Sequence, residues 1–129
     1  MFACLYLCAI GIPHVYAINF GVQEQKENLA KAFGVERIFR LDGTDNDQKI
    51  VTELTEITGG LGVDLVFEAS GAPAAVPMGL QLLRNRGVYL VPGQYSNHGD
   101  VAISPQLITF KALQILGSSQ YSMVGVRKY

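Results

Sequence analysis

The feature that most constrains the fold is a regular alternation of short apolar runs with segments of helical periodicity. Five runs containing β-branched or aromatic residues follow one another along the chain, and each is followed within three residues by glycine. Such alternation predicts an α/β fold, in which helices cover a parallel sheet. The expected strands are 15–20, 37–41, 63–68, 87–91 and 113–116, and the expected helices are 23–33, 46–58, 74–83 and 105–110.

Local signals refine these elements. Asp45 and Gln48 stand at the spacing of a capping box at the start of the helix over 46–58. Glu27 and Lys31, four residues apart on the helix over 23–33, are expected to form an ion pair. The run 65–67 is apolar at three successive positions, which predicts a strand buried on both faces.

The amino-terminal segment 2–12 is apolar. No Lys or Arg precedes it, and its eleven residues are too few to cross a bilayer, so no membrane partner is predicted. We expect residues 2–9 to form a helix of the domain. A cleavable signal peptide and a strand over 2–7 are the alternatives.

Charge and ligand-forming side chains argue against several kinds of site. Ten Lys and Arg nearly balance eleven Asp and Glu without clustering, so no nucleic-acid partner is predicted. Zinc sites use three or four well-spaced ligands, whereas Cys4 and Cys8 have no His or carboxylate near them and are interpreted as small buried thiols. His14 and His98 are expected at the surface.

Ligands of open α/β sheets bind at the carboxyl ends of the strands. Gly71, Gly93 and Gly117 stand there, just after apolar runs, where the missing Cβ would let a flat ligand approach the backbone. A tight turn is the alternative explanation for each glycine taken singly. Asp64 and Glu68 share one strand face, and we interpret them as a polar pair at the strand end rather than as an acid and a base.

Several segments together resemble one protein family. They are GIPHVYAIN, ENLAKAFGV, GVYLVPGQY, LITFKALQILGS and, most specific of all, ITGGLGVDLVFEASGAPAAV. From about Ala9 to Ser119 the chain resembles the coenzyme-binding domain of zinc-type alcohol dehydrogenases, within the medium-chain dehydrogenase/reductase family. The resemblance implies a Rossmann-type sheet that holds NAD(H) or NADP(H) for hydride transfer with an alcohol or polyol.

The same resemblance implies roles for residues at the strand ends. Where the family has an acid for the adenosine ribose, residues Asn19 to Gly21 offer none, and Asn19 would bind a ribose hydroxyl as a neutral group. Lys26 is the closest cation in the sequence, so the choice between NAD and NADP stays open. The residues implied beside the adenosine are Ala69, Ser70 and Ala72, and those whose backbone would face the nicotinamide carboxamide are Pro92, Gln94, Ser118 and Gln120.

Two parts of the family pattern have no counterpart in the sequence. No G-x-G-x-x-G phosphate loop occurs, and neither does the domain that holds zinc in the family. We therefore expect an amino-terminally truncated chain that forms an incomplete Rossmann-like, doubly wound parallel sheet without its first strand. Residues 1–129 would then be one partial domain, with 1–11 as the end of the first helix and 120–129 as a carboxyl-terminal tail.

Loss of a central strand would separate the strands at 15–20 and 37–41 from the other three, unless the strand at 15 pairs directly with the strand at 63. The resulting exposed edges predict marginal stability. The expected function is that of a cytoplasmic dehydrogenase fragment that is not catalytic alone. The alternatives are a non-catalytic partner, joining its own copy or a full-length relative through the last edge strand 113–116, and an S-adenosylmethionine-binding domain.

Overall fold

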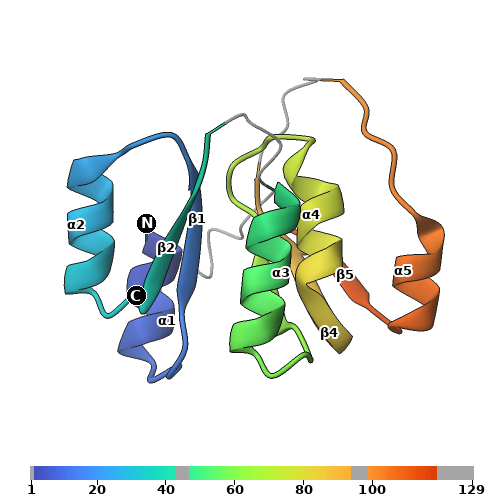
Figure 1. Ribbon diagram of the computed structural model, residues 1–129, viewed down its shortest axis with the longest axis horizontal. Coiled ribbons are helices and arrows are strands. Elements are labelled where there is room, and N and C mark those ends of the chain that lie inside the picture. The colour runs from blue at the N-terminus through green and yellow to red at the C-terminus, as the bar shows by residue number, and fades with distance from the viewer. Residues whose placement is uncertain (1, 43–46, 94–98, 119–129) are drawn as a thin grey trace, which may run out of the picture. The chain divides into compact units, whose positions relative to one another are not determined.

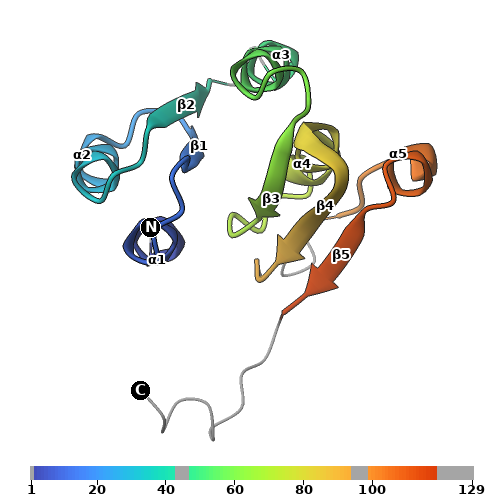
Figure 2. The ribbon, with the colours of Figure 1, turned by 90° about the horizontal axis from the view of Figure 1, so that it is seen from below.

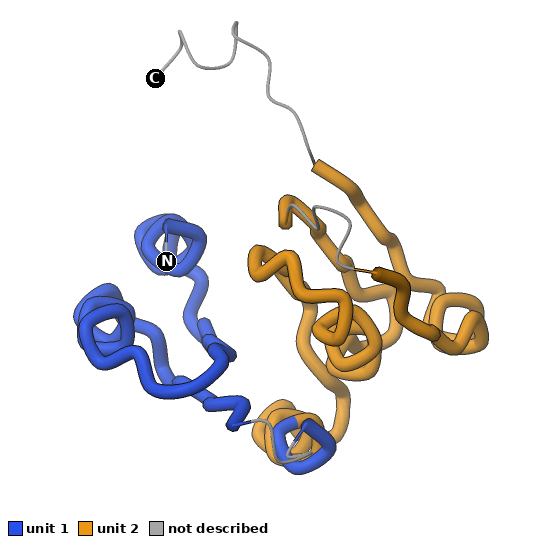
Figure 3. The backbone as a smooth tube through the Cα atoms, turned by 90° about the horizontal axis from the view of Figure 1, so that it is seen from above, with its two compact units in different colours: residues 1–50 blue, residues 51–129 orange. Residues whose placement is uncertain are grey.

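The computed structural model describes residues 2–42, 47–93 and 99–118, and the chain divides into two compact units, 1–50 and 51–129 (Figure 3). The expected α/β fold with parallel strands is confirmed. In chain order the elements are α1 (Phe2–Ala9), β1 (Tyr16–Phe20), α2 (Glu24–Ala32), β2 (Arg37–Leu41), α3 (Asp47–Ile57), β3 (Val63–Phe67), α4 (Ala75–Leu82), β4 (Leu83–Val91), α5 (Pro105–Phe110) and β5 (Gln114–Gly117) (Figure 1).

The first unit is built on the parallel pair β1–β2. Val15, Ala30 and Val35 form its small buried core, and the half-buried thiols of Cys4 and Cys8 on α1 pack against that core. The helix expected over 2–9 is thus confirmed, and the alternative strand over 2–7 is wrong. Among the described residues, no helix is both long and apolar enough to cross a bilayer.

α2 ends in a way that its sequence predicts. Gly34 adopts a φ of +97°, a left-handed conformation that glycine reaches without a Cβ penalty. The N–H of Val35 then reaches back to the carbonyl oxygen of Ala30 at 3.1 Å. This reversal carries the chain from α2 into β2.

The second unit contains a three-stranded parallel sheet in the order β3-β4-β5 (Figure 2). Tyr89, in the central strand β4, is 1% exposed. Leu80 of α4 belongs to the same buried cluster, and Leu107 of α5 packs against it. Both helices therefore cover the sheet face that carries Tyr89.

Two glycines permit close approaches in this unit. Gly79 lies in α4 directly over the Tyr89 ring, where any Cβ would collide with the ring. Gly62 precedes β3 with a φ of +91°, and its added Cβ would lie 2.6 Å from the carbonyl oxygen of Leu82. The start of β3 therefore runs against the junction between α4 and β4.

The sheet of the second unit corrects two expectations. Leu65 and Phe67 are each 38% exposed, so β3 is not buried on both faces. The reason is that α4 and α5 pack on the opposite face, where Val66 lies beside Tyr89 in register. β4 begins at Leu83 rather than at residue 87, because a register shift after Val63 lets the chain pair with β3 earlier.

Asp45 of the expected capping box lies outside the described residues.

The described strands lie in two sheets, β1-β2 and β3-β4-β5. This agrees with the separation expected for a sheet without a central strand. Direct pairing of the strand at 15 with the strand at 63, the alternative, is wrong for these residues.

Candidate functional site

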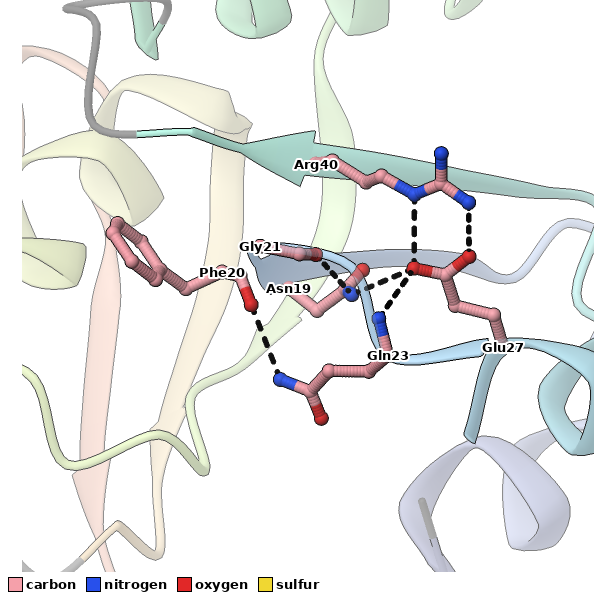
Figure 4. Close-up of polar contacts among 6 residues, drawn as sticks. All are labelled: Asn19, Phe20, Gly21, Gln23, Glu27 and Arg40. Atoms are coloured by element: carbon pink, nitrogen blue, oxygen red, sulfur yellow. Dashed lines mark hydrogen bonds and ion pairs between the residues drawn. The ribbon is translucent and has the colours of Figure 1, made fainter. Parts of the chain in front are cut away.

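Asn19 lies at the carboxyl end of β1, in the first unit (Figure 4). Its Nδ2 donates to the carbonyl oxygen of Gly21 at 3.1 Å and to Oε1 of Glu27 at 3.0 Å. Its Oδ1 is buried and has no hydrogen-bond partner among the described residues. The Asn19 amide nitrogen therefore holds the turn between β1 and α2.

Glu27 joins Asn19 to the neighbouring strand (Figure 4). It is 4% exposed, and it accepts hydrogen bonds from Arg40 through Nε at 2.9 Å and through Nη2 in a second, shorter contact. The backbone N–H of Gln23 donates to the same carboxylate at 3.3 Å. Two parallel bonds from one guanidinium to one carboxylate form the strongest type of protein ion pair.

This pair corrects two expectations. Glu27 pairs with Arg40 and not with Lys31. Sequence distance indicated only Lys26 as a cation near the end of β1, whereas Arg40 lies opposite Asn19 in the strand register. Thirteen residues separate Glu27 from Arg40, so only the parallel pairing of β1 with β2 brings them together.

The Glu27 ion pair has a defined acid dependence. Hydrogen bonds from Arg40, and then from Asn19, lower the pKa of Glu27 to about 2. An unfolded glutamate titrates near about 4.3. Because the folded value is the lower one, the Glu27 carboxylate stabilises the fold fully above the unfolded pKa, and this contribution is lost as the pH falls toward 2.

We expect Glu27→Gln to lower the free energy of unfolding at neutral pH and to flatten its decrease between about pH 4.5 and 2. Urea unfolding across that pH range measures both effects. Glu56→Gln, at an exposed position of α3, is the control and should leave the pH dependence unchanged. Equal acid dependence in wild type and Glu27→Gln would contradict the assignment.

In the second unit, the carboxyl ends of three parallel strands lie at one edge of the sheet. The N–H of Gly93, after β4, donates to the carbonyl oxygen of Glu68, after β3, at 3.1 Å. The N–H of Ser118, after β5, donates to the carbonyl oxygen of Val91 at 3.0 Å. Ala69, Ser70, Ala72 and Ser118 are exposed at this edge, and Pro92 is half-buried there. Gln94 and Gln120 lie outside the described residues.

Glu68 is the residue at these strand ends whose contacts the sequence did not predict. It is 5% exposed, and its Oε1 accepts the N–H of Ser70 at 2.6 Å, the N–H of Gly71 at 3.3 Å and the Ser70 hydroxyl. Asp64 instead pairs with Arg84. The two carboxylates therefore have separate partners, and the polar pair expected from the sequence is wrong.

The described residues do not fit a zinc ion. None of them form a group of three or more His, Cys, Asp or Glu side chains that could hold a metal. His14 is exposed, as expected, and its Nδ1 lies 2.7 Å from Oε2 of Glu36. His98 lies outside the described residues.

The strand ends of the second unit do fit the flat ends of a dinucleotide. Nothing lies within 4 Å of the position that a Cβ would take at Gly117, so the backbone there is open to a planar group. The sequence contains no G-x-G-x-x-G loop, whose backbone N–H groups would bind the pyrophosphate.

Comparisons with known proteins agree with this architecture. A family model described as zinc-binding dehydrogenase matches residues 1–128. L-threonine 3-dehydrogenase of Pyrococcus furiosus is 37% identical over 95 residues, 73% of this chain and 26% of that protein. D-xylulose reductase A of Aspergillus oryzae is 29% identical over 124 residues, 94% of this chain and 33% of that protein.

Solved structures share the fold. The crystal structure of 2R,3R-butanediol dehydrogenase from Bacillus subtilis superposes with a TM-score of 0.77 at 24% identity, over 96% of this chain and 33% of that one. Other solved structures with this fold are complexes with NADPH. The chain spans between about a quarter and a third of the length of the relatives named here.

Proposed function

This chain belongs to the zinc-binding dehydrogenase family, and we propose that it is the coenzyme-binding part of an NAD- or NADP-dependent alcohol or polyol dehydrogenase. The row of parallel strand ends in the second unit carries the proposal, because the backbone at Gly117 is open and Gly117 lies beside Val91 at the ends of β5 and β4. The relatives are much longer than this chain. We therefore assign turnover to a whole protein and only coenzyme binding to these 129 residues, which are not catalytic alone.

The proposed contacts follow the strand ends. Exposed Ala69, Ser70 and Ala72 offer a neutral surface to the adenosine. For the ribose we propose Asn19 and Gly21 of the first unit, on the family resemblance alone. Pro92 has no N–H, and that of Ser118 already bonds to Val91, so both would face the carboxamide with their carbonyl oxygens. Gln94 and Gln120 complete the proposed set. The nicotinamide, when bound, accepts or donates a hydride.

Calorimetry with NAD, NADH, NADP and NADPH tests this function. We expect weak binding, with a Kd of about 1 mM, because no glycine-rich loop supplies N–H groups to the pyrophosphate. Ala69→Trp should abolish binding by covering the proposed adenosine surface. Ala32→Trp, at an exposed position in the other unit, is the control and should bind as wild type does.

Two outcomes count against the proposal. Binding that Ala69→Trp leaves intact would place the coenzyme elsewhere. No heat with any of the four coenzymes would remove coenzyme binding from the isolated chain. We propose the cytoplasm as the cellular location of the protein.

A second candidate function is that of a non-catalytic partner. All residues of β5 are exposed, including Ile115 at 45% and Leu116 at 49%, and among the described strands β5 pairs only with β4. An unpaired edge of this kind can add a strand from a second copy or from a full-length relative. A monomer at every concentration in analytical ultracentrifugation, alone and with an intact relative, would exclude it.

A further inference from the structure

We propose that Glu68 is a positioning residue for the dinucleotide, acting through the turn 69–72 and through Gly93. This inference rests on the proposed coenzyme-binding function. Glu68 is not itself one of the residues proposed to contact the dinucleotide, but its carboxylate is hydrogen-bonded to Ser70, which is one of them. Glu68 is buried directly beneath the proposed binding surface.

The first observation is the environment of the carboxylate. A buried carboxylate is costly unless hydrogen bonds satisfy it. Two successive backbone N–H groups, of Ser70 and Gly71, point at Oε1 of Glu68, together with the Ser70 hydroxyl. Gly71 adopts a φ of +70°. Successive N–H groups in such a turn form a concave anion-binding nest, and here the protein's own carboxylate fills it.

The second observation concerns the rest of the turn. The N–H of Ala72 donates to Oγ of Ser70 at 3.1 Å. The N–H groups of Ser70, Gly71 and Ala72 are therefore all bound to Glu68 or to the side chain that Glu68 holds. Because these N–H groups are occupied and the exposed side chains of Ala69 and Ala72 are methyl groups, the turn suits an uncharged adenosine better than a phosphate.

The third observation links Glu68 to the neighbouring strand. A Cβ added to Gly93 would lie 2.6 Å from Oε2 of Glu68 and 3.1 Å from the backbone nitrogen of Gly71. The backbone after β4 is thus packed directly on the carboxylate. One side chain consequently sets the position of the turn 69–72 relative to the backbone of Gly93.

The test uses Glu68→Gln and Glu68→Ala in the full chain, with Asp64→Asn as a control for an exposed carboxylate of the same strand. NADH binding is followed by fluorescence titration, and exchange of the Ser70 and Gly71 amide hydrogens is followed by NMR without ligand. We expect Glu68→Ala to raise the Kd about tenfold and Glu68→Gln, which keeps one neutral acceptor, about threefold. Asp64→Asn should bind NADH as wild type does.

The variants distinguish a positioning role of Glu68 from a purely structural one. Positioning requires Glu68→Gln to weaken binding at an unchanged melting temperature, with faster exchange at Ser70 and Gly71 but not in β1 and β2. If Glu68→Ala does not fold, Glu68→Gln decides alone. Wild-type affinity in folded Glu68→Gln, or unchanged amide exchange, overturns the inference and leaves the proposed function standing. If wild type binds no NADH, the titration is made with NADPH, and absence of binding of both overturns the proposed function, and the ligand assigned to this turn with it.

Discussion

Replacing Gly62 with alanine is expected to lower the free energy of unfolding by about 2–5 kcal/mol. Two costs add at this position. A non-glycine residue is strained at a φ of +91°, and its Cβ would lie 2.6 Å from one backbone atom and 2.9 Å from another at the junction of α4 and β4. Backbone atoms cannot rotate away as a side chain can. Urea unfolding followed by circular dichroism measures the loss.

Gly60→Ala separates the two costs. Gly60 has a φ of +84°, but nothing lies within 4 Å of its added Cβ, so only the strain of about 1–2 kcal/mol remains. The difference between the two variants measures the close approach alone. Equal losses would mean that the start of β3 does not run against Leu82.

Tyr89→Ala is expected to cost about 3–5 kcal/mol, as for other large aromatic side chains removed from a core. Tyr89 is 1% exposed, and α4 and α5 both pack on the cluster that contains it. Natural domains are stable by only about 5–15 kcal/mol, so the second unit should be largely unfolded at room temperature in mild urea. Near-ultraviolet circular dichroism and the midpoint of denaturation report the change.

Tyr89→Phe is the matched control for this experiment. It keeps the ring and removes only the hydroxyl, which donates to the carbonyl oxygen of Ala75 at a long 3.4 Å. Its expected cost is below about 1 kcal/mol. A large effect of Tyr89→Phe, or a small one of Tyr89→Ala, would show that the packing of the ring is not what holds α4 and α5 to the sheet.

The order and type of the helices and strands could be predicted from the sequence because each is encoded locally. The run before Gly21 and the apolar periodicity after Asp47 need no distant partner to be recognised. The early start of β4 and the exposure of Leu65 and Phe67 could not be predicted. Both depend on which strands pair and on which sheet face the helices cover.

The candidate site was predictable in its backbone and not in its polar contacts. Glycines just after apolar runs indicated the edge at which the strand ends meet, and those ends do lie together in the second unit. The pairing of Glu27 with Arg40 requires the register of β1 against β2. The role of Glu68 requires the closeness of Gly93, a residue from the next strand. Neither the Glu27–Arg40 pair nor the contact of Glu68 with Gly93 can be predicted from sequence spacing alone.

The positions of the two cysteines in this chain have a practical consequence. Both cysteines of the protein lie on α1 and are half-buried against Val15, Ala30 and Val35. A thiolate reacts only when it is accessible, so iodoacetamide should alkylate the half-buried Cys4 and Cys8 faster when the α1 core opens. The second unit contains no sulfhydryl, and the wild-type chain can therefore report on one of its two halves without any introduced label.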